Sequence, residues 1–459
     1  MRNLLSYFLF ALLLGVGCRS RTPGGAVSGS PRADRVAGRL TATAVRVKPA
    51  GGAWELYRLP ALTPVEGSTG RLPRVDTLVG IDIESDVLYL RTVRDDILAL
   101  DLVGARVDTV AAGSMRTTLG PDGTLFVVDG RRHVTSLKRR VRRAWPDTLP
   151  TLPEVVFGAA DQRLLGVTRD SDPLLFAVSA DQPIATQALP ATGAVTATQW
   201  GDVVAVANEA GVLLLDPVGR RPARFVALHG APHALAFSPS GHRLYVLRRD
   251  RAEIAVVDRF ARREVDEIPL LAPAAEMRLD PLGRWLLVRP AIGDSVWIID
   301  LPTRSLAGTI AASWQSDLPA IAPDGTMLAR RGDDVVVIAL DSLAEVARLA
   351  NAAGDMWLVS AWRPRGLPSQ AASGAGGSVE SGSEGPLYVQ VSVSQNQVWS
   401  SENAQQLVRA GLPARVLPPR SAEDGYRVVL GPYPSRAEAE AMGRKLGRPF
   451  WIYQADQPR

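Results

Sequence analysis

Short apolar segments that end in an acidic residue recur along most of the chain. Their spacing is regular, because the last four end at intervals of 42, 42 and 41 residues. A repeat of about 40 residues that contains several short strands is typical of a β-propeller, in which each repeat forms one blade. The five segments are Ile97–Asp101, Val212–Asp216, Ile254–Asp258, Val296–Asp300 and Val337–Asp341.

Turns rich in Pro and Gly precede most of these segments and divide each repeat into strands. The turns are Gly120–Gly123, Ser238–Gly241, Asp280–Gly283 and Ala322–Gly325. Each repeat therefore predicts a first strand, a Pro/Gly turn, a second strand, a polar break, a third strand that ends in Asp, and a polar outer strand. Further third strands fit at Trp54–Leu59, His133–Lys138 and Leu174–Ser179, which makes eight third strands.

The last apolar segment of this series, Asp355–Trp362, is a first strand that no strands of its own repeat follow. Its missing partners are expected at the other end of the series, from Thr41 onward. The ring is therefore expected to close by pairing one C-terminal strand with three N-terminal strands. We expect a mainly β protein with an eight-bladed propeller over residues 40–364, or a seven-bladed one if a weak repeat is a loop.

A different pattern, strand–helix–strand repeated twice, occupies residues 387–453. Its first half comprises an alternating strand at 387–391, a helical run at 403–410 and an extended segment at 413–417. Its second half comprises 426–430, 436–446 and 450–453. This order predicts a small α+β domain over 386–459, with a four-stranded antiparallel sheet and two helices on one face.

Alternation along the first strand predicts which of its side chains face the helices. Val389, Val391 and Val393 point one way, and Gln390 and Ser392 point the other. The helices carry apolar residues at helical spacing to cover the valines, and Ser435–Glu438 has the pattern of a capping box at the start of the second helix. These apolar residues are Ala404, Leu407, Val408, Ala439, Met442 and Leu446.

The other face of the sheet is expected to be polar and free of helices. Arg427 and Val429 should share it with Gln390, because Val428 and Leu430 belong to the core. An amide and a guanidinium on a flat surface suit a neutral or anionic sugar chain, since the guanidinium can pair with a carboxylate. Trp451 or Tyr453 could stack on a sugar ring at the edge of the face. The alternative is an ordinary solvated sheet face.

The segment Gly425–Gly447, GYRVVLGPYPSRAEAEAMGRKLG, resembles the SPOR (sporulation-related repeat) family. The resemblance implies binding of peptidoglycan glycan strands in a bacterial envelope, with Gln390, Ser392, Arg427, Val429, Trp451 and Tyr453 as candidate glycan-binding residues. At 390–394 the chain has QVSVS where the family has Gln-Val-Gly-Ser-Phe. In the repeats, the turn-and-Asp pattern from Gly241 to Asp258 resembles YVTN-type and WD40-like bacterial propellers.

The N-terminus has the features of an export signal. A short basic start precedes an apolar run from Leu4 to Val16, which is too short to span a bilayer and fits a secretory signal. The sequence Gly15–Cys18 resembles a lipobox, so we expect a lipoprotein signal over 1–18 with lipidation of Cys18; the alternative is a plain secretory signal. Cys18 is the only cysteine, which excludes a disulfide framework. Arg19 does not resemble an inner-membrane retention signal, which favours the periplasmic side of the outer membrane.

Two stretches rich in small and polar residues separate these parts. Residues 19–39 form a predicted flexible tether, and residues 365–385 form a Gly/Ser linker without apolar periodicity.

No residue pattern in the propeller points to catalysis. His229 and His233 could bind a metal, but a hydrogen-bonded loop pair is the better interpretation, because no further His or Cys stands at ligand spacing. The Asp residues that end the third strands recur, which favours a turn-capping role over a catalytic pair. The chain contains no nucleophile elbow, phosphate loop or zinc-protease motif. We therefore expect no enzyme, no metal and no cofactor.

Charge adds little to this picture. The chain has 52 basic and 47 acidic residues, and the dense cluster Lys138–Arg143 is interpreted as a solvated blade edge, although it could meet anionic lipid or a partner. A nucleic-acid partner is not expected for an exported chain.

Together these features predict an envelope lipoprotein. Its C-terminal domain would bind peptidoglycan, with the division septum as a possible location, and its propeller would serve as an interaction platform for unknown protein partners. Two alternatives are a propeller-housed hydrolase that acts on cell-wall or sugar substrates, and a structural tether between wall and membrane.

Overall fold

The computed structural model describes residues 42–360, apart from 84, 160–161, 170–171, 191–192, 240 and 281–282, and parts of 386–454. In the second region it leaves out 395–396, 398–399, 402–403, 405–406, 409–411, 420–424 and 446–449. The predicted signal with Cys18, the tether 19–39 and the linker 365–385 lie outside the described residues. No helix among the described residues is long and apolar enough to cross a membrane.

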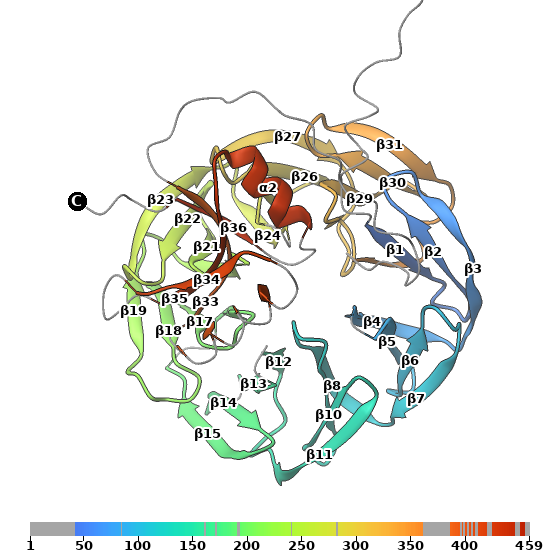
Figure 1. Cartoon of the computed structure of the whole chain (residues 1–459), viewed down its shortest axis with the longest axis horizontal. Coiled ribbons are helices and arrows are strands. Elements are labelled where there is room, and N and C mark those ends of the chain that lie inside the picture. Colours follow the sequence, from blue (N-terminus) through green and yellow to red (C-terminus); the bar gives the residue numbers. More distant parts are fainter. Residues whose placement is uncertain are drawn as a thin grey trace, which may run out of the picture. The chain divides into compact units, whose positions relative to one another are not determined.

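Residues 42–360, as far as they are described, form eight four-stranded antiparallel sheets around a central axis (Figure 1). The first sheet combines both ends of this region, in the order β3 (Thr63–Leu72), β2 (Gly52–Arg58), β1 (Thr43–Val47) and β32 (Met356–Ser360). The other sheets follow chain order. The second contains β4 (Val75–Asp82), β5 (Val87–Thr92), β6 (Ile97–Asp101) and β7 (Val107–Ala111), and the third β8 (Ser114–Leu119), β9 (Leu125–Asp129), β10 (His133–Lys138) and β11 (Val141–Thr148).

The remaining sheets have the same arrangement. The fourth contains β12 (Val155–Gly158), β13 (Leu164–Val167), β14 (Leu174–Ser179) and β15 (Gln182–Ala188), and the fifth β16 (Val195–Ala197), β17 (Val204–Asn208), β18 (Gly211–Leu215) and β19 (Arg224–Ala227). The sixth contains β20 (Pro232–Phe237), β21 (Arg243–Arg248), β22 (Glu253–Asp258) and β23 (Arg263–Pro269), and the seventh β24 (Ala274–Leu279), β25 (Trp285–Pro290), β26 (Ser295–Asp300) and β27 (Ser305–Ala311). The eighth contains β28 (Ala320–Ile321), β29 (Thr326–Arg331), β30 (Asp334–Ala339) and β31 (Ala344–Leu349).

The hydrophobic core of the ring lies between neighbouring sheets. In most sheets the second and third strands are buried on both faces, which explains why they are continuous apolar runs in the sequence; the third strands β2 and β10 are only partly buried. The outer strands are largely exposed, as in β23 and β27, where exposed and half-buried residues alternate. One cluster joins the eighth sheet to the first through Leu328, Val335, Ala44 and Tyr57. Because each sheet needs both neighbours to cover its two faces, the ring is stable only when it is closed.

The predicted third strands coincide with strands of the structure. β6, β10 and β14 have the predicted bounds, whereas β30 ends at Ala339, before the predicted Asp341. The predicted closure is confirmed, because β32 pairs with β1 in the register Thr43↔Ser360 to Val47↔Met356.

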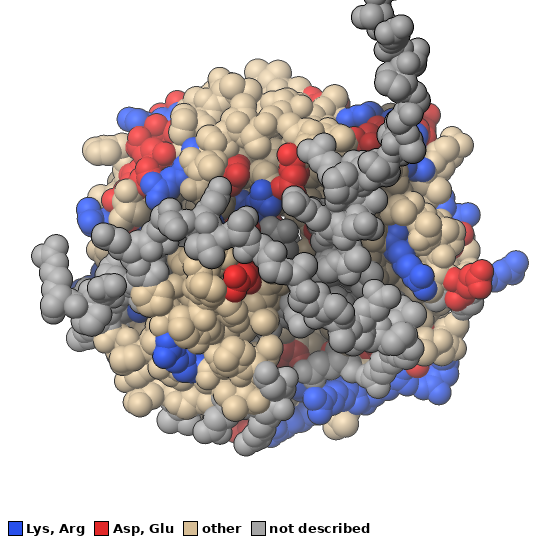
Figure 2. All heavy atoms as spheres, turned by 45° about the horizontal axis from the view of Figure 1, so that its top comes forward, with Lys and Arg blue, Asp and Glu red and all other residues tan. Residues whose placement is uncertain are grey.

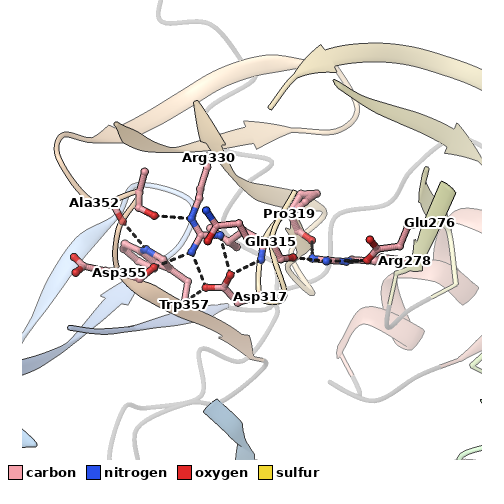
Figure 3. Close-up of polar contacts among 11 residues, drawn as sticks. Glu276, Arg278, Gln315, Asp317, Pro319, Arg330, Ala352, Asp355 and Trp357 are labelled. Atoms are coloured by element: carbon pink, nitrogen blue, oxygen red, sulfur yellow. Dashed lines mark hydrogen bonds and ion pairs between the residues drawn. The ribbon is translucent and has the colours of Figure 1, made fainter. Parts of the chain in front are cut away.

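We call the place where β32 pairs with β1 the seam of the ring. A network of buried ion pairs and hydrogen bonds stabilises it (Figure 3). Arg330 donates two hydrogen bonds of 2.8 Å to the carboxylate of Asp317 and a third, of 2.7 Å, to the carbonyl of Ala353. The Asp317 carboxylate also accepts the backbone N–H of Trp357 in β32 at 2.8 Å. Arg330 keeps only 3% of its side chain exposed, so removing one partner leaves a buried charge uncompensated. On the other side of β32, Arg46 of β1 pairs with Asp355 at 2.6 Å.

The C-terminal region forms a separate four-stranded antiparallel sheet. Its order is β34 (Ala414–Leu417), β35 (Tyr426–Tyr433), β33 (Leu387–Ser394) and β36 (Trp451–Gln454). The helix α2 (Arg436–Lys445) packs on one face, and its start is capped by Ser435 Oγ, which accepts the backbone N–H of Glu438 at 3.2 Å.

The predicted first helix of this domain lies partly outside the described residues. Ala404 and Leu407 join Val389, Val391 and Ala439 in the domain's hydrophobic cluster. The prediction for Val408 is wrong, because its side chain is 53% exposed. Ala404 and Leu407 lie on the side of the predicted helix that faces the sheet. Val408 is next to Leu407 in the sequence and lies beyond the part of the helix surface that the sheet covers.

Candidate functional site

The C-terminal sheet has a second face, opposite its hydrophobic cluster, and strand register shows which residues share it. Residues directly opposite each other in an antiparallel pair place their side chains on the same face. Val389 pairs with Leu430, and both belong to the cluster. Gln390 pairs with Val429, so these two residues lie on the second face, as predicted.

A bulge in β33 changes the face on which its last residues lie. The register shifts between Gln390 and Ser392, so that Ser392 pairs with Val428 and Val393 pairs with Arg427. An inserted residue reverses the alternation beyond it. The prediction that Ser392 lies beside Gln390 and that Val393 joins the valine face is therefore wrong: Val393 shares the face of Arg427.

A row of residues crosses this second face from edge to edge. Arg415 of β34 is opposite Val429, Val429 is opposite Gln390, and Gln390 is opposite Trp451 of β36. Next to this row, Tyr453 is opposite Tyr388. Four of the six candidate residues (Gln390, Val429, Trp451 and Tyr453) thus hold adjacent register positions, and Arg427 lies two pairs further along β35.

Arg415 is a candidate that the sequence interpretation missed. Its guanidinium donates a hydrogen bond to the hydroxyl of Tyr388 and lies 4.7 Å from the centre of that ring. Stacking on the Tyr388 ring restricts the conformations of the Arg415 side chain. It thereby keeps a positive charge in the row that contains Gln390. The available signal was the alternation of Ala414, Arg415 and Val416, which places the arginine away from the core.

The amide of Gln390 is chemically unsatisfied. Its side chain has no exposed surface, and neither Oε1 nor Nε2 has a hydrogen-bond partner among the described residues. A buried amide without partners costs about 1–3 kcal/mol. Ser392 and Val429 are also fully buried, and Arg427 is 5% exposed. The prediction of a bare, solvated face is therefore wrong for this structure, and a ligand with a donor and an acceptor could recover this free energy only by reaching a buried position.

In the ring, by contrast, three of the five recurring aspartates bond to their own turns. Asp258 Oδ1 accepts the backbone N–H groups of Phe260 and Ala261, both at 2.9 Å, while Oδ2 contacts Arg243 and lies 3.1 Å from His242 Nε2. Burial by itself raises the pKa of Asp258, but hydrogen bonds from His242 and Ala261 and the charge of Arg243 outweigh it and hold this pKa well below its usual range. The pKa of His242 is lowered, chiefly by burial.

The turn-capping prediction is confirmed for three of the five aspartates. Asp101 accepts the N–H groups of Val103 and Gly104, and Asp216 accepts that of Val218. Asp300 differs, because its buried Oδ1 has no partner among the described residues. Asp341 also differs, since it follows the end of β30 and pairs with Arg284 at 2.8 Å.

Only one of the two histidines considered as metal ligands lies in a loop. His229 lies in the turn before β20, whereas His233 lies in β20 itself and its buried Nδ1 has no hydrogen-bond partner among the described residues, so the interpretation as a hydrogen-bonded loop pair is wrong for His233. The carbonyl of His229 accepts a hydrogen bond from Arg248 at 2.7 Å, and burial lowers the pKa of His233. Within the described part of the chain, no group of three or more His, Cys, Asp or Glu residues could hold a metal ion.

The basic cluster at the β10–β11 hairpin is partly neutralised by its neighbours. Lys138 pairs with Asp122 and Arg140 with Asp101, each at 2.7 Å, and Arg143 pairs with Asp181. Figure 2 shows a band of basic side chains along the lower edge of the molecule, on the side where Figure 1 places β11. β11 is the exposed outer strand of its sheet, and charges on such an edge oppose pairing with another chain.

Comparison with known proteins identifies both architectural parts. Residues 383–449 match the family model of the SPOR domain. The ring resembles solved β-propellers: dihydro-heme d1 dehydrogenase NirN in complex with DHE (TM-score 0.51, 17% identity, 68% of this chain and 73% of that chain), and AztD from Citrobacter koseri (TM-score 0.53, 11% identity, 71% of this chain and 100% of that chain). At these identities the likeness concerns the fold alone. No curated protein sequence matches the chain.

Proposed function

We propose that this chain is an envelope protein that binds peptidoglycan glycan strands through its C-terminal domain. The match of residues 383–449 to the SPOR domain carries the proposal. The row of Arg415, Val429, Gln390 and Trp451 supports it, because it places a cation, an unsatisfied amide and an indole-bearing residue in line across one sheet face. Such a row suits an extended sugar chain, and the guanidinium of Arg427 or Arg415 can pair with a lactyl carboxylate.

The eight sheets of residues 42–360 act as an eight-bladed platform for partner proteins. Two carboxylates of the inner strands are already paired: Asp76, near the start of β4, with Arg91 at 2.5 Å, and Glu276 of β24 with Arg278 at 2.9 Å. Such pairs lack the freedom of a catalytic acid and base, which favours a binding role over the hydrolase alternative.

Lipidation of Cys18 places the protein on the periplasmic side of the outer membrane, and the glycan-binding domain directs it to peptidoglycan, including that of the division septum. Changing Cys18→Ser tests the anchor. The variant is expected in the soluble periplasm or unprocessed after the wall is digested, and an unchanged outer-membrane fraction would count against lipidation.

The glycan site is tested by pelleting the full chain with purified peptidoglycan sacculi. Arg427→Ala is expected to weaken binding by roughly 10- to 150-fold, which corresponds to a charge-assisted hydrogen bond of about 1.5–3 kcal/mol. Gln390→Ala and Arg415→Ala should weaken it as well, and circular dichroism should show an intact fold.

Arg436→Ala is the matched control, because Arg436 lies on α2 and pairs with Glu440 at 3.0 Å. It should pellet like the unchanged protein. If the three variants on the sheet face also pellet normally while folded, the glycan contacts lie elsewhere.

A further inference from the structure

A second charged site lies in the ring, in a cavity of about 310 Å³ between the fifth and sixth sheets. Its apolar wall is formed by Val203, Leu214, Leu215 and Phe260. Its charged residues are four arginines and two aspartates: Arg221, Arg224, Arg259, Arg262, Asp202 and Asp216. The cavity therefore carries a net charge of +2 over an apolar surface.

Some of the charged residues pair with each other and thereby fix the wall of the cavity. Arg259, with 2% of its side chain exposed, donates two hydrogen bonds to Asp202, at 3.2 and 2.8 Å, and stacks 4.4 Å from the ring centre of Phe260. Asp216 is engaged by the backbone N–H of Val218 at 3.0 Å. These contacts hold the interior rigid before any ligand arrives.

Arg221 and Arg224 at the mouth differ from Arg259. Both are exposed, and the side chain of neither makes an ion pair or hydrogen bond among the described residues, although the backbone of Arg224 pairs with β18. Like charges held close together repel each other, and an anion between them removes that repulsion. Two guanidinium groups beside an apolar wall are suited to a carboxylate carried on a short aliphatic chain.

The cavity opens on the face of the ring from which the chain leaves towards the glycan-binding domain. Asp202 lies in the turn that follows the innermost strand of its sheet, β16, and Ser360 ends the innermost strand of the first sheet, β32. Innermost strands of all blades run in the same direction, so both residues lie on the same face. The sequence predicts a flexible linker over 365–385, and a flexible chain of that length has a root-mean-square reach of roughly 25 Å, so a bound glycan strand would stay near this face.

We propose that this cavity binds a free carboxylate of the peptide stems that peptidoglycan carries. The inference rests on the proposed function, because a glycan strand held by the C-terminal domain presents its stems to the ring at high effective concentration. The ring would then recognise the peptide part of the wall while the C-terminal domain recognises the sugar part. The ring could bind the peptide weakly and the C-terminal domain could bind the sugar weakly, and the whole chain would still bind peptidoglycan with high affinity.

The test uses the full chain and a soluble stem tetrapeptide with free carboxylates, measured by calorimetry. The double variant Arg221→Gln/Arg224→Gln is expected to lose at least about 10-fold in affinity, as for loss of one charge-assisted hydrogen bond. The control Arg131→Gln/Arg249→Gln removes two exposed arginines from turns between second and third strands, on the opposite face, and should bind like the unchanged protein. Equal binding by the cavity variant would overturn the proposal.

Two further probes define the ligand. The same tetrapeptide with amidated carboxyl groups should not bind, and inorganic phosphate at equal concentration should bind more weakly than the free peptide. Binding of the amidated peptide, or tighter binding of phosphate, would overturn the assignment to a carboxylate-bearing peptide.

The outcome is separable from that of the glycan site. Gln390→Ala should leave binding of the soluble tetrapeptide unchanged, and the cavity variant should still bind glycan strands from which an amidase has removed the peptides. The cavity variant is also compared with the unchanged protein on intact sacculi. If the two proteins bind intact sacculi equally well, the ring does not contact the stems.

Discussion

The ring and the C-terminal sheet use their polar residues in opposite ways. In the ring, three of the five aspartates that recur from blade to blade are bonded to their own turns, namely Asp101, Asp216 and Asp258. In the C-terminal sheet, Gln390 occurs once and its amide has no partner. A recurring polar residue that is bonded to its own turn has a structural role. Asp300 also recurs but keeps a buried oxygen without a partner among the described residues, so recurrence alone does not decide the role. The amide of Gln390 occurs once and has no such bond, which makes it the better place for a ligand.

The two regions also differ in where their cores lie. Each blade is covered by its two neighbours, so the ring depends on its seam. The C-terminal sheet and its helices enclose a cluster of their own. Stability of the ring is thus a property of the whole circle, and stability of the C-terminal domain is local.

The largest expected effect comes from opening the circle. Deletion of residues 40–62 removes β1 and β2 and leaves the edge of β32 unpaired, so the protein should aggregate. Deletion of 365–459 should leave a soluble ring with an unchanged β-type circular dichroism spectrum. A soluble, monomeric product of the first deletion would show that the seam is dispensable.

A point change at the seam should act in the same direction on a smaller scale. Asp317→Ala leaves Arg330 buried without its carboxylate, which typically costs about 3–5 kcal/mol. Urea denaturation should show a lower midpoint for the ring. Asp181→Ala, which breaks the exposed pair with Arg143, is the control and should change the midpoint little.

Acid should reveal the contribution of the turn aspartates. The pKa of Asp258 is depressed in the folded ring, so its stabilisation is complete above the unfolded value of about 4 and is lost as pH falls below that value towards the folded one. Asp258→Asn should lose about 1.5–3 kcal/mol at pH 7, and the difference from the unchanged protein should shrink below pH 4. A pH-independent difference in the urea midpoint would exclude the carboxylate charge as its cause.

The smallest effect on stability, and the sharpest contrast, is expected for Gln390→Leu. Replacing an unsatisfied buried amide by an apolar side chain of similar size should leave stability unchanged or raise it by up to about 1–3 kcal/mol. Binding to sacculi should fall nonetheless. A variant that is clearly destabilised would show that Gln390 serves the fold, as the aspartates do.

Much of the fold follows from the sequence, because its signals are local and repeated. The third strands are visible as apolar runs with a fixed spacing. The mixed first sheet is visible because strands without partners remain at both ends of the series of repeats. The SPOR-like segment was equally visible from its strand–turn–helix pattern.

The features that escaped prediction depend on contacts between distant residues. The bulge after Gln390 is set by how β33 pairs with β35, and it moved Ser392 and Val393 to unexpected faces. Arg415 became a candidate only once β34 was placed beside β35. The pairing of Asp317 with Arg330 and Trp357 likewise joins segments that no sequence pattern connects.

The register of the seam has a mechanical consequence. Thr43 and Ser360, the two points where the chain enters and leaves the ring, are opposite each other at one end of the β1–β32 pair. If the segment before Thr43 is anchored in a membrane and the domain after Ser360 grips the wall, as proposed, tension between them loads that pair from one end. The hydrogen bonds would then break one after another, and at low force, until the ion pairs beside Met356 and Val47 are reached.

Single-molecule pulling by the two chain ends measures this opening. A disulfide between Thr43→Cys and Ser360→Cys should abolish the low-force step, and a low-force step that survives the disulfide would mean that another part of the chain yields first. The attachment between membrane and wall would thus contain a link that lengthens under load, and because each sheet depends on its neighbours for cover, the sheets beside the opened seam would be the next to yield.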